Sequence, residues 1–489
     1  MRRLVAFFLP ILLIACGDAR GDGVVDVAII GEAADADTDS VRLNHAGQHI
    51  RAATAQGLVR LDEAGDVVPA IAERWIVTDD GTSYIFRIRE FDLADNERLT
   101  AQAVRDSLRR TIARLAGTSM GLDFGKLRDI RAMTGRVVEI RLKSPMPELL
   151  HLLAQPEMGL SVGRSAIGPM TYVDDGGSLL LDPMPPEARG LPLQPGWNEE
   201  VRRIRLGAVS AEAATNGFAE GRYDVVLGGT LADLPLAEAG PLSRGTIRLG
   251  STVGLFGLDI RRAEGFLAEA ENREMLAMAL DRAALIEPFN IAGWTASTRL
   301  VPPDFSGSSE PATERWGSLS LEQRRARSRE AVAAWARANG EVTMRIALPD
   351  GPGSDILLRG LAAQWAEIGV RLIRVTGDGV RQGGAELVLR DRVARFGGAL
   401  WFLNQFNCRV TRSICSEDVD FLVELANNAA DPAESANYMA EAEAALIAFN
   451  PFIPIGAPIR WSMVRADVAG FAENPWNLHP LFPLSRAPI

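Results

Sequence analysis

The pattern of hydrophobic and polar positions predicts a chain in which strands and helices alternate. β-Branched residues dominate positions 24–30, and such a run is typical of a strand. Apolar and charged residues alternate over 83–89 and 136–142, as they do in half-buried antiparallel strands. Between these two strands, apolar residues recur at helical spacing after Thr100, a residue type that caps helix N-termini. The pattern therefore predicts an antiparallel sheet with a helix packed on it.

The second half contains a compact β-α-β pattern. A predicted strand over 343–348 leads to a helix capped by Ser354, which ends at Gly369, and a second strand follows over 370–375. Five prolines over 182–197 exclude a regular element there. Further helices are expected over 40–57, after Asn272, and after Asp431-Pro432. We predict an α/β fold with mixed sheets rather than a strict alternation of strand and helix.

The N-terminus predicts export and a lipid anchor. Two arginines precede an apolar run over 4–15 that is too short for an ordinary transmembrane helix. The run ends in Leu13-Ile14-Ala15-Cys16, which resembles the lipobox of bacterial lipoproteins. The alternative is an ordinary signal peptide that happens to contain a cysteine. We expect a signal peptide over 1–15, acylation of Cys16 and a tether over 16–23, on the periplasmic or cell-surface side of a bacterial membrane.

Composition changes this picture in two respects. The net charge is −11, which argues against a nucleic-acid binder because such proteins need a basic footprint. Three cysteines and four histidines exclude a disulfide-dense scaffold. In an oxidising compartment Cys408 and Cys415 are expected to form a disulfide that contributes roughly 2–3 kcal/mol on a chain-entropy model. A metal site is the alternative for these two cysteines, although no histidine is near them in sequence.

Two other motifs are typical of a hydrolase and of a metal site, and we expect neither function here. Residues 159–163 match the G-x-S-x-G nucleophile elbow, but Gly163, Gly168 and Pro169 follow the serine where the motif requires a helix. His45 and His49 have the i, i+4 spacing that lets two imidazoles share a metal. A surface or capping role is the expected one, because two ligands alone rarely hold a metal. We predict no enzyme activity, no cofactor and no metal.

Several phrases taken in order resemble the extracellular solute-binding proteins of the oligopeptide, dipeptide and nickel import family. They are Gly57-Leu58-Val59-Arg60-Leu61-Asp62, 67–75, 79–84, the helix start Leu99-Thr100-Ala101, 138–145, Gly168-Pro169, Phe218-Ala219-Glu220-Gly221 with Asp224, Leu300-Val301-Pro302-Pro303 and Ile453-Pro454-Ile455. The resemblance implies a two-lobed clamshell of the larger, three-subdomain kind, which encloses a ligand by closing about two hinge strands.

The resemblance also implies a division of the chain. The first lobe is expected to comprise 24–58, 162–255 and the returning tail 456–489. An inserted subdomain is expected over 59–161, and the second lobe over 256–455. The implied partners are a small-molecule or short-peptide ligand and an ABC permease in the cytoplasmic membrane, with the receptor itself a monomer.

One segment departs from the pattern of the peptide-binding members of that family. In those members an aspartate holds the α-ammonium group of the peptide; alignment on Phe402-Leu403 puts Arg395 at that position. A guanidinium suits a carboxylate or phosphate instead. The alternative role for Arg395 is an ion pair with Asp391. Trp401 and Phe402 either stack on a ligand or fill the hinge core, and Phe396 and Asn404 complete the candidate ligand contacts.

The sequence therefore predicts a lipid-anchored substrate-binding protein of an ABC importer. A peptide or peptide-like solute is the leading ligand class. The alternatives are an anionic or metal-bearing solute, favoured by Arg395, and a binding or scaffold lipoprotein that has lost transport.

Overall fold

The computed structural model describes residues 23–33, 40–90, 98–162, 165–237, 245–305, 314–377 and 383–487. The predicted signal peptide, Cys16 and most of the tether lie outside these residues. Within the described residues, none of the helices has both the length and the apolar character needed to cross a membrane.

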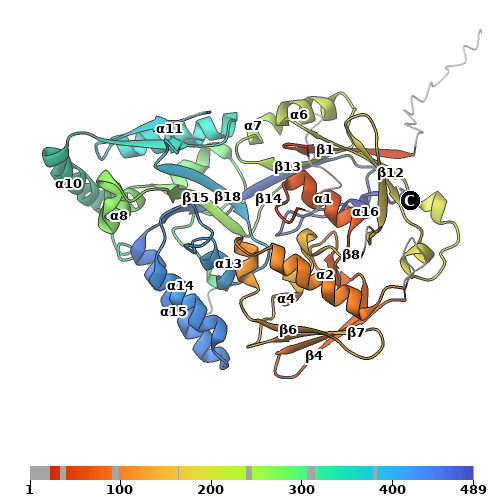
Figure 1. Cartoon of the computed structure of the whole chain (residues 1–489). Helices are drawn as coiled ribbons and strands as arrows, with labels where there is room; N and C mark the ends of the chain where they lie inside the picture. Colours follow the sequence, from red (N-terminus) through yellow and green to blue (C-terminus); the bar gives the residue numbers. More distant parts are fainter. Residues whose placement is uncertain are drawn as a thin grey trace, which may run out of the picture.

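A seven-stranded mixed sheet forms the first lobe (Figure 1). The strand over 24–30 lies inside it and pairs in parallel with its neighbours on both sides. The β-branched residues of this strand are buried on both faces, as expected for a central strand that helices cover. The strand order is β10 (Met170–Asp174), β11 (Leu179–Pro183), β12 (Arg203–Val209), β1 (Val24–Ile30), β13 (Val225–Thr230), β20 (Ile459–Val464) and β14 (Ile247–Ser251).

A five-stranded mixed sheet forms the second lobe. Its strand order is β17 (Val370–Arg374), β16 (Val342–Ala347), β18 (Leu387–Val393), β15 (Gly254–Ile260) and β19 (Phe452–Gly456). The chain crosses from the first sheet to the second between Ser251 and Gly254, and returns between Gly456 and Ile459. Both crossings are short, and each joins two strands directly.

A four-stranded antiparallel unit is attached to the first lobe. Its strand order is β4 (Ala72–Val77), β5 (Ser83–Ile88), β7 (Val137–Leu142) and β6 (Leu127–Ala132). Helix α2 (Ala101–Arg114) packs on this sheet through Val104 and Leu108, and the Thr100 side chain accepts a hydrogen bond from the Ala103 amide. Two small hairpins flank the unit: β2 (Val59–Leu61) with β3 (Val67–Pro69), and β8 (Ser161–Val162) with β9 (Ser165–Ala166).

The remaining helices cover the sheets and fill the space between the lobes. In Figure 1 the two long helices α14 and α15 lie side by side at the edge of the second lobe. The helices are α1 (His45–Thr54), α3 (Ser119–Asp123), α4 (Leu149–Leu153), α5 (Trp197–Glu200), α6 (Ala211–Ala219), α7 (Leu234–Ala237), α8 (Ala270–Met278), α9 (Arg282–Ile286), α10 (Leu321–Asn339), α11 (Pro352–Ala366), α13 (Ala399–Asn404), α14 (Glu417–Asn428), α15 (Pro432–Phe449) and α16 (Leu481–Leu484).

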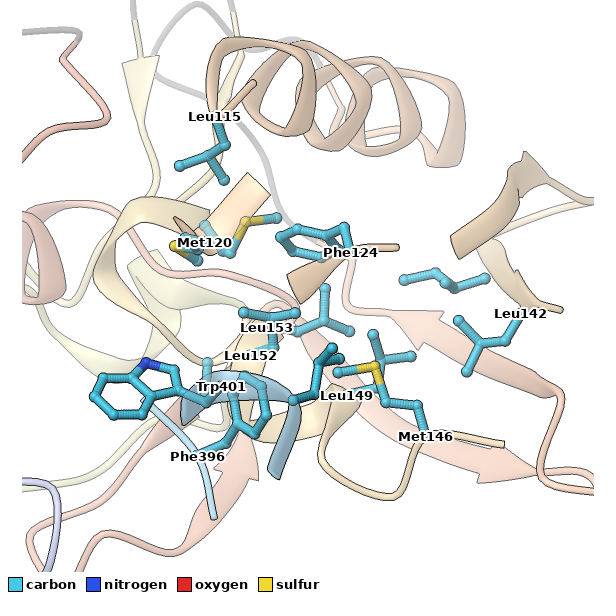
Figure 2. Close-up of a cluster of buried hydrophobic side chains, with 14 of the residues drawn as sticks. Leu115, Met120, Phe124, Leu142, Met146, Leu149, Leu152, Leu153, Phe396 and Trp401 are labelled. Atoms are coloured by element: carbon cyan, nitrogen blue, oxygen red, sulfur yellow. The ribbon is translucent and has the colours of Figure 1, made fainter. Parts of the chain in front are cut away.

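A continuous hydrophobic cluster joins the four-stranded unit to the second lobe, and we call it the apolar junction. The first-lobe side contributes Leu115, Met120, Phe124, Met146, Leu149, Leu152 and Leu153, and the second-lobe side contributes Phe396, Trp401 and Phe402. Figure 2 shows Phe396 and Trp401 beside the leucines of α4. The lobes are therefore in apolar contact here.

The main strands agree with the sequence pattern, and helix ends account for most of the errors. Helix α8 begins at Ala270, so Asn272 lies in its first turn and does not cap it. Helix α11 begins at Pro352, two residues before the predicted cap Ser354. Helix α15 is capped by Asp431, as predicted. A proline in the first helical position tolerates its missing N–H, which explains why Pro352 rather than Ser354 opens α11.

The proline-rich stretch also contains short regular pieces. The last two residues of β11, a 3-10 turn over Pro186–Arg189 and the first residue of α5 fall within 182–197. The expectation of no regular element there was wrong for these few residues, because prolines fit strand ends and the first position of a helical turn.

Candidate functional site

A cavity of about 580 Å³ lies between the two lobes. One side is formed by residues 41–44 before α1, by the start of α3, and by Glu157 of the 3-10 turn Pro156–Met158. The other side is formed by Arg261 after β15, the C-terminal end of β18 and residues 410–412. A ligand in this cavity would contact both lobes, and its size is ordinary for a small-molecule site.

The side chains that line this cavity are strongly biased toward positive charge. A single carboxylate, that of Glu157, accompanies six arginines on the wall: Arg42, Arg261, Arg390, Arg392, Arg395 and Arg412. The chain as a whole has a net charge of −11, so this wall is opposite in sign to the whole protein. We call it the arginine cleft.

Arg395 spans the two lobes through a bidentate ion pair. Its Nη1 lies 2.7 Å from Oε2 of Glu157, and its Nη2 lies 2.8 Å from Oε1. The Arg395 carbonyl also accepts a hydrogen bond from Nε2 of Gln155 at 3.0 Å. Burial alone would lower the pKa of Arg395, but attraction to Glu157 and the hydrogen bonds between them raise it. The fork geometry matches the carboxylate, so both charges are compensated.

The alternative pairing of Arg395 with Asp391 was wrong. Asp391 lies on β18 and accepts from Nη1 of Arg460 on β20 at 2.7 Å. Residues 391 and 395 are separated by the end of a strand, not by a helical turn. The Asp391–Arg460 pair instead joins one strand of each sheet, close to the second chain crossing. Burial raises the pKa of Asp391, while attraction to Arg460 and the hydrogen bond from it lower it in part.

A second arginine of the cleft is also compensated. Arg390 places Nη2 at 2.7 Å from Oδ2 of Asp259 on β15. Its guanidinium lies 4.7 Å from the centre of the Phe406 ring, within cation–π range. Arg390 and Arg395 are thus held in place by groups of the protein itself.

The other four arginines have no carboxylate within ion-pair distance among the described residues. They are Arg42, Arg261, Arg392 and Arg412. Burial lowers the pKa of Arg392 to about 10, and repulsion from Arg395 and Arg390 contributes to that shift. Burial also lowers the pKa of Arg261; Asp259 opposes the shift, and Arg390 and Arg412 reinforce it. Both side chains remain charged at neutral pH.

The structure distributes the candidate ligand contacts among three places. Arg395 lines the arginine cleft. Phe396, Trp401 and Phe402 lie in the apolar junction, each at most 1% exposed, and the rings of the last two meet edge to face with centres 4.9 Å apart. Asn404 lines a separate cavity of about 480 Å³. The residues that the sequence analysis grouped as candidate ligand contacts are therefore separated in the structure, and their role in ligand binding stays a prediction.

Asn404 forms a buried contact across the lobes. Its Nδ2 donates to Oδ1 of Asp123 at 2.8 Å, and Oδ2 of Asp123 has no hydrogen-bond partner among the described residues. Burial raises the pKa of Asp123 to about 7, with the Asn404 hydrogen bond and the charges of Arg395 and Arg392 lowering it in part. This carboxyl thus lies between the arginine cleft and the apolar junction.

The sequence reasoning missed most of the arginine cleft. Arg390, Arg392 and Arg395 form a visible cluster on one strand end, and that signal could have been used. Arg261 and Arg412 join them only because the Cys408–Cys415 loop folds back on β15, where the Ile414 amide donates to the Ile260 carbonyl at 3.0 Å. No local pattern contains this contact.

The other motifs found in the sequence have structural surroundings. Cys408 and Cys415 form a disulfide bond. His45 and His49 pack edge to face, with ring centres 4.5 Å apart. Burial lowers the pKa of His49 to about 4, so the surface role suggested for this pair was wrong for His49, which is fully buried. Ser161 begins the hairpin β8–β9 and is not followed by a helix; Gly163 lies outside the described residues.

The fold and the cavity define an architecture: two α/β lobes, joined by short crossings, with a cavity between them. Solved structures share the fold over nearly the whole chain. Haemophilus influenzae OppA in complex with the peptide RPPGFSPFR matches with a TM-score of 0.77 at 16% identity, over 95% of this chain and 99% of that one. AgaA in complex with agropinic acid, from Agrobacterium tumefaciens, matches with a TM-score of 0.73 at 17% identity, over 96% and 99%.

Sequence comparison finds similarity to one family over part of the chain. Residues 66–169 match the family model described as bacterial extracellular solute-binding proteins, family 5 middle. The probable deoxycholate-binding periplasmic protein YgiS of Escherichia coli is 28% identical over 125 residues, which are 21% of this chain and 23% of that relative's length. Over residues 66–169 the chain is therefore similar to the family 5 extracellular solute-binding proteins.

Proposed function

We propose that this protein is the solute-binding component of an ABC import system, which encloses its solute in the arginine cleft and presents it to a permease. The observation that carries this proposal is the 580 Å³ cavity with walls from both lobes. A solute held by both walls stabilises the closed form over the open one, which is how a ligand shifts such an equilibrium.

The crossings at residues 251–254 and 456–459 are proposed as the hinges. The lobes would then be 24–58 with 162–255 and 456–489 on one side, and 256–455 on the other, with 59–161 as the inserted subdomain. Because both hinges consist of a few residues between strand ends, rotation there leaves the two sheets intact.

The charge of the cleft bears on the ligand class. Peptide-binding OppA and agropinic acid-binding AgaA share this fold, so the fold alone does not choose between a peptide-like solute and another one. Glu157 is the carboxylate that lines the cleft, and Arg395 already occupies it. A peptide-like solute would therefore be held through its carboxylates and not through its amino terminus. An anionic solute is the class that this site favours.

The N-terminal lipid is part of the proposal. Cys16 would carry the acyl chains and residues 16–23 would tether the lobes to the membrane. A Cys16→Ser variant is expected to move from the membrane fraction to the soluble periplasmic or culture fraction. Retention of that variant in the membrane fraction would contradict anchoring through Cys16.

The test of the function is recovery of a ligand. The protein is purified gently from its own host, and small molecules released by denaturation are identified by mass spectrometry. Adding the recovered solute to stripped protein should reduce its radius of gyration in small-angle X-ray scattering, as a closing clamshell requires. If no solute is released and the stripped protein neither compacts nor gains thermal stability with any host extract, a non-transport scaffold lipoprotein becomes the better interpretation.

A further inference from the structure

The arginine cleft carries more positive charge than the protein itself compensates. Glu157 neutralises Arg395, and Asp259 neutralises Arg390. The four other arginines, named above, have no carboxylate in ion-pair distance in the described part of the chain. The chain has 63 acidic and 52 basic residues, so carboxylates outnumber cations in the whole protein. The small number of carboxylates on this wall is therefore a property of the site and not of the composition.

These uncompensated cations come from separate parts of the fold. Arg42 stands on the first-lobe wall, whereas Arg261, Arg392 and Arg412 stand on the second-lobe wall. Each presents a planar fork that suits one carboxylate or phosphate. A solute with two anionic groups can therefore occupy forks on both walls at once.

The like charges also oppose one another when the cleft holds no anion. Repulsion from Arg390 and Arg395 contributes to the lowered pKa of Arg392, and repulsion from Arg390 and Arg412 contributes to that of Arg261. An anion at the centre of this group would replace repulsion with attraction. A multiply charged solute can do so for both arginines at once.

Gln405 adds a neutral recognition group to the same wall. Its side chain is buried and lines the cleft, and its Nε2 donates to the Trp401 carbonyl at 2.9 Å. Its Oε1 has no hydrogen-bond partner among the described residues. An unpaired buried acceptor costs free energy, so a solute that offers a hydroxyl or N–H would be favoured.

We infer that the solute of this protein carries at least two anionic groups, carboxylates or phosphates, together with a hydrogen-bond donor, and that Arg261, Arg392 and Arg412 bind the anionic groups opposite Arg42. This inference rests on the proposed solute-binding function and gives that function its ligand chemistry.

The test is an equilibrium titration of the purified full protein with defined probes. Citrate supplies three carboxylates and one hydroxyl, and pyrophosphate supplies two phosphates. Acetate and inorganic phosphate are the single-group controls, and the uncharged acetyl-trialanine amide is the peptide control. Citrate or pyrophosphate should bind at least tenfold more tightly than its single-group control. Which of the two binds more tightly distinguishes a carboxylate solute from a phosphate solute.

Variants assign the effect to the site. Arg392→Gln and Arg261→Gln should each weaken binding of the preferred probe at least tenfold, and Arg42→Gln tests the opposite wall. Arg371→Gln is the matched control, because Arg371 is 63% exposed on β17 and does not line the cleft. Circular dichroism of every variant checks that it is folded.

The outcomes separate the inference from the function beneath it. The inference is overturned if the polyanions bind no better than their controls, if the cleft variants bind as the parent does, or if the solute released from native protein has one anionic group or none. In that last case the solute-binding function still stands. If nothing is released and no probe binds, the proposed function itself fails.

Discussion

The two lobes meet in two regions of opposite character. In the arginine cleft, six guanidinium groups face one carboxylate around a cavity. In the apolar junction, Phe396 and Trp401 pack on leucines and methionines of the four-stranded unit (Figure 2). Phe402 belongs to the same cluster. The same eight-residue segment supplies both, because Arg395 faces the cleft and the aromatic residues that follow enter the junction. Burial of apolar surface fixes how the lobes fit together, whereas ligand recognition is the role that we propose for the charged groups of the cleft.

This comparison predicts that the largest losses of stability come from the apolar junction. Trp401→Ala should lower the free energy of unfolding by about 3–5 kcal/mol, since it removes a large buried ring and leaves a cavity. Trp401 is 1% exposed, so the space left by its ring is closed to solvent and water cannot readily fill it. Urea denaturation followed by circular dichroism measures the change.

Phe421→Ala is the control for that experiment. Phe421 lies on α14 in the same lobe but is 60% exposed, so the free energy of unfolding should change by less than about 0.5 kcal/mol. Equal losses from Trp401→Ala and Phe421→Ala would show that the junction is not a tight core.

The ion pair at the edge of the cleft should have the next largest effect. Glu157→Gln removes the charge partner of Arg395, and an uncompensated buried guanidinium should lower the free energy of unfolding by about 3 kcal/mol. The double variant with Arg395→Gln should recover much of this loss, because no charge is then left buried alone. A double-mutant cycle from urea denaturation measures the coupling. If the double variant loses as much free energy of unfolding as the two single variants lose together, the ion pair does not stabilise the fold.

The fold was largely readable from the sequence, because its signals are local. The strand at 24–30, the alternating strands of the four-stranded unit and the caps Thr100 and Asp431 all depend on residues within a few positions of each other. Helix α8 shows the limit, since Glu269 and not Asn272 precedes its first residue. Glu269 makes no side-chain capping hydrogen bond, so no capping residue in the sequence marks this helix start.

The candidate site was readable only in part, because it is assembled from distant segments. Arg395 stood out through its departure from a family pattern, but its partner Glu157 is 238 residues away. Aromatic side chains at 396, 401 and 402 fit a stacking site and a core equally well by residue type. The structure decides for a core, because the leucines of α4 pack against these aromatic residues. Only the tertiary fold brings the two segments together.

The buried carboxyl of Asp123, which lies between the two regions, predicts a pH dependence. Burial raises its pKa from 3.8 to about 7 in the folded protein. Between these values the unfolded chain releases a proton that the folded protein keeps, so the free energy of unfolding falls as the pH rises. Asp123 should therefore account for a loss of about 2 kcal/mol between about pH 5 and pH 7.

The measurement for Asp123 is the difference between the parent and Asp123→Asn across that pH range. Asparagine keeps an oxygen that can accept from Asn404 but does not titrate. The variant should gain stability relative to the parent as the pH rises, and the gain should level off above the folded pKa. A constant difference from about pH 5 to pH 8 would mean that the carboxyl does not titrate there.

The smallest effect on stability is expected in the cleft itself, from Arg392→Gln. This side chain keeps much of its surface open to the cavity, although the protein around its guanidinium lowers its pKa. The repulsion from Arg390 and Arg395 is partly offset by attraction to Asp123 and Glu157. The free energy of unfolding without ligand should change by less than about 0.5 kcal/mol. Arg371→Gln, at an exposed position, should be equally neutral. The melting temperatures of the two variants should differ once citrate or pyrophosphate is added, whichever the parent binds. The ligand should raise the melting temperature of Arg371→Gln more than that of Arg392→Gln, because only a bound ligand stabilises the folded protein. If Arg392→Gln lowered the free energy of unfolding by several kcal/mol without ligand, Arg392 would be needed for folding. The contrast between an arginine cleft that binds ligand and an apolar junction that stabilises the fold would then be wrong.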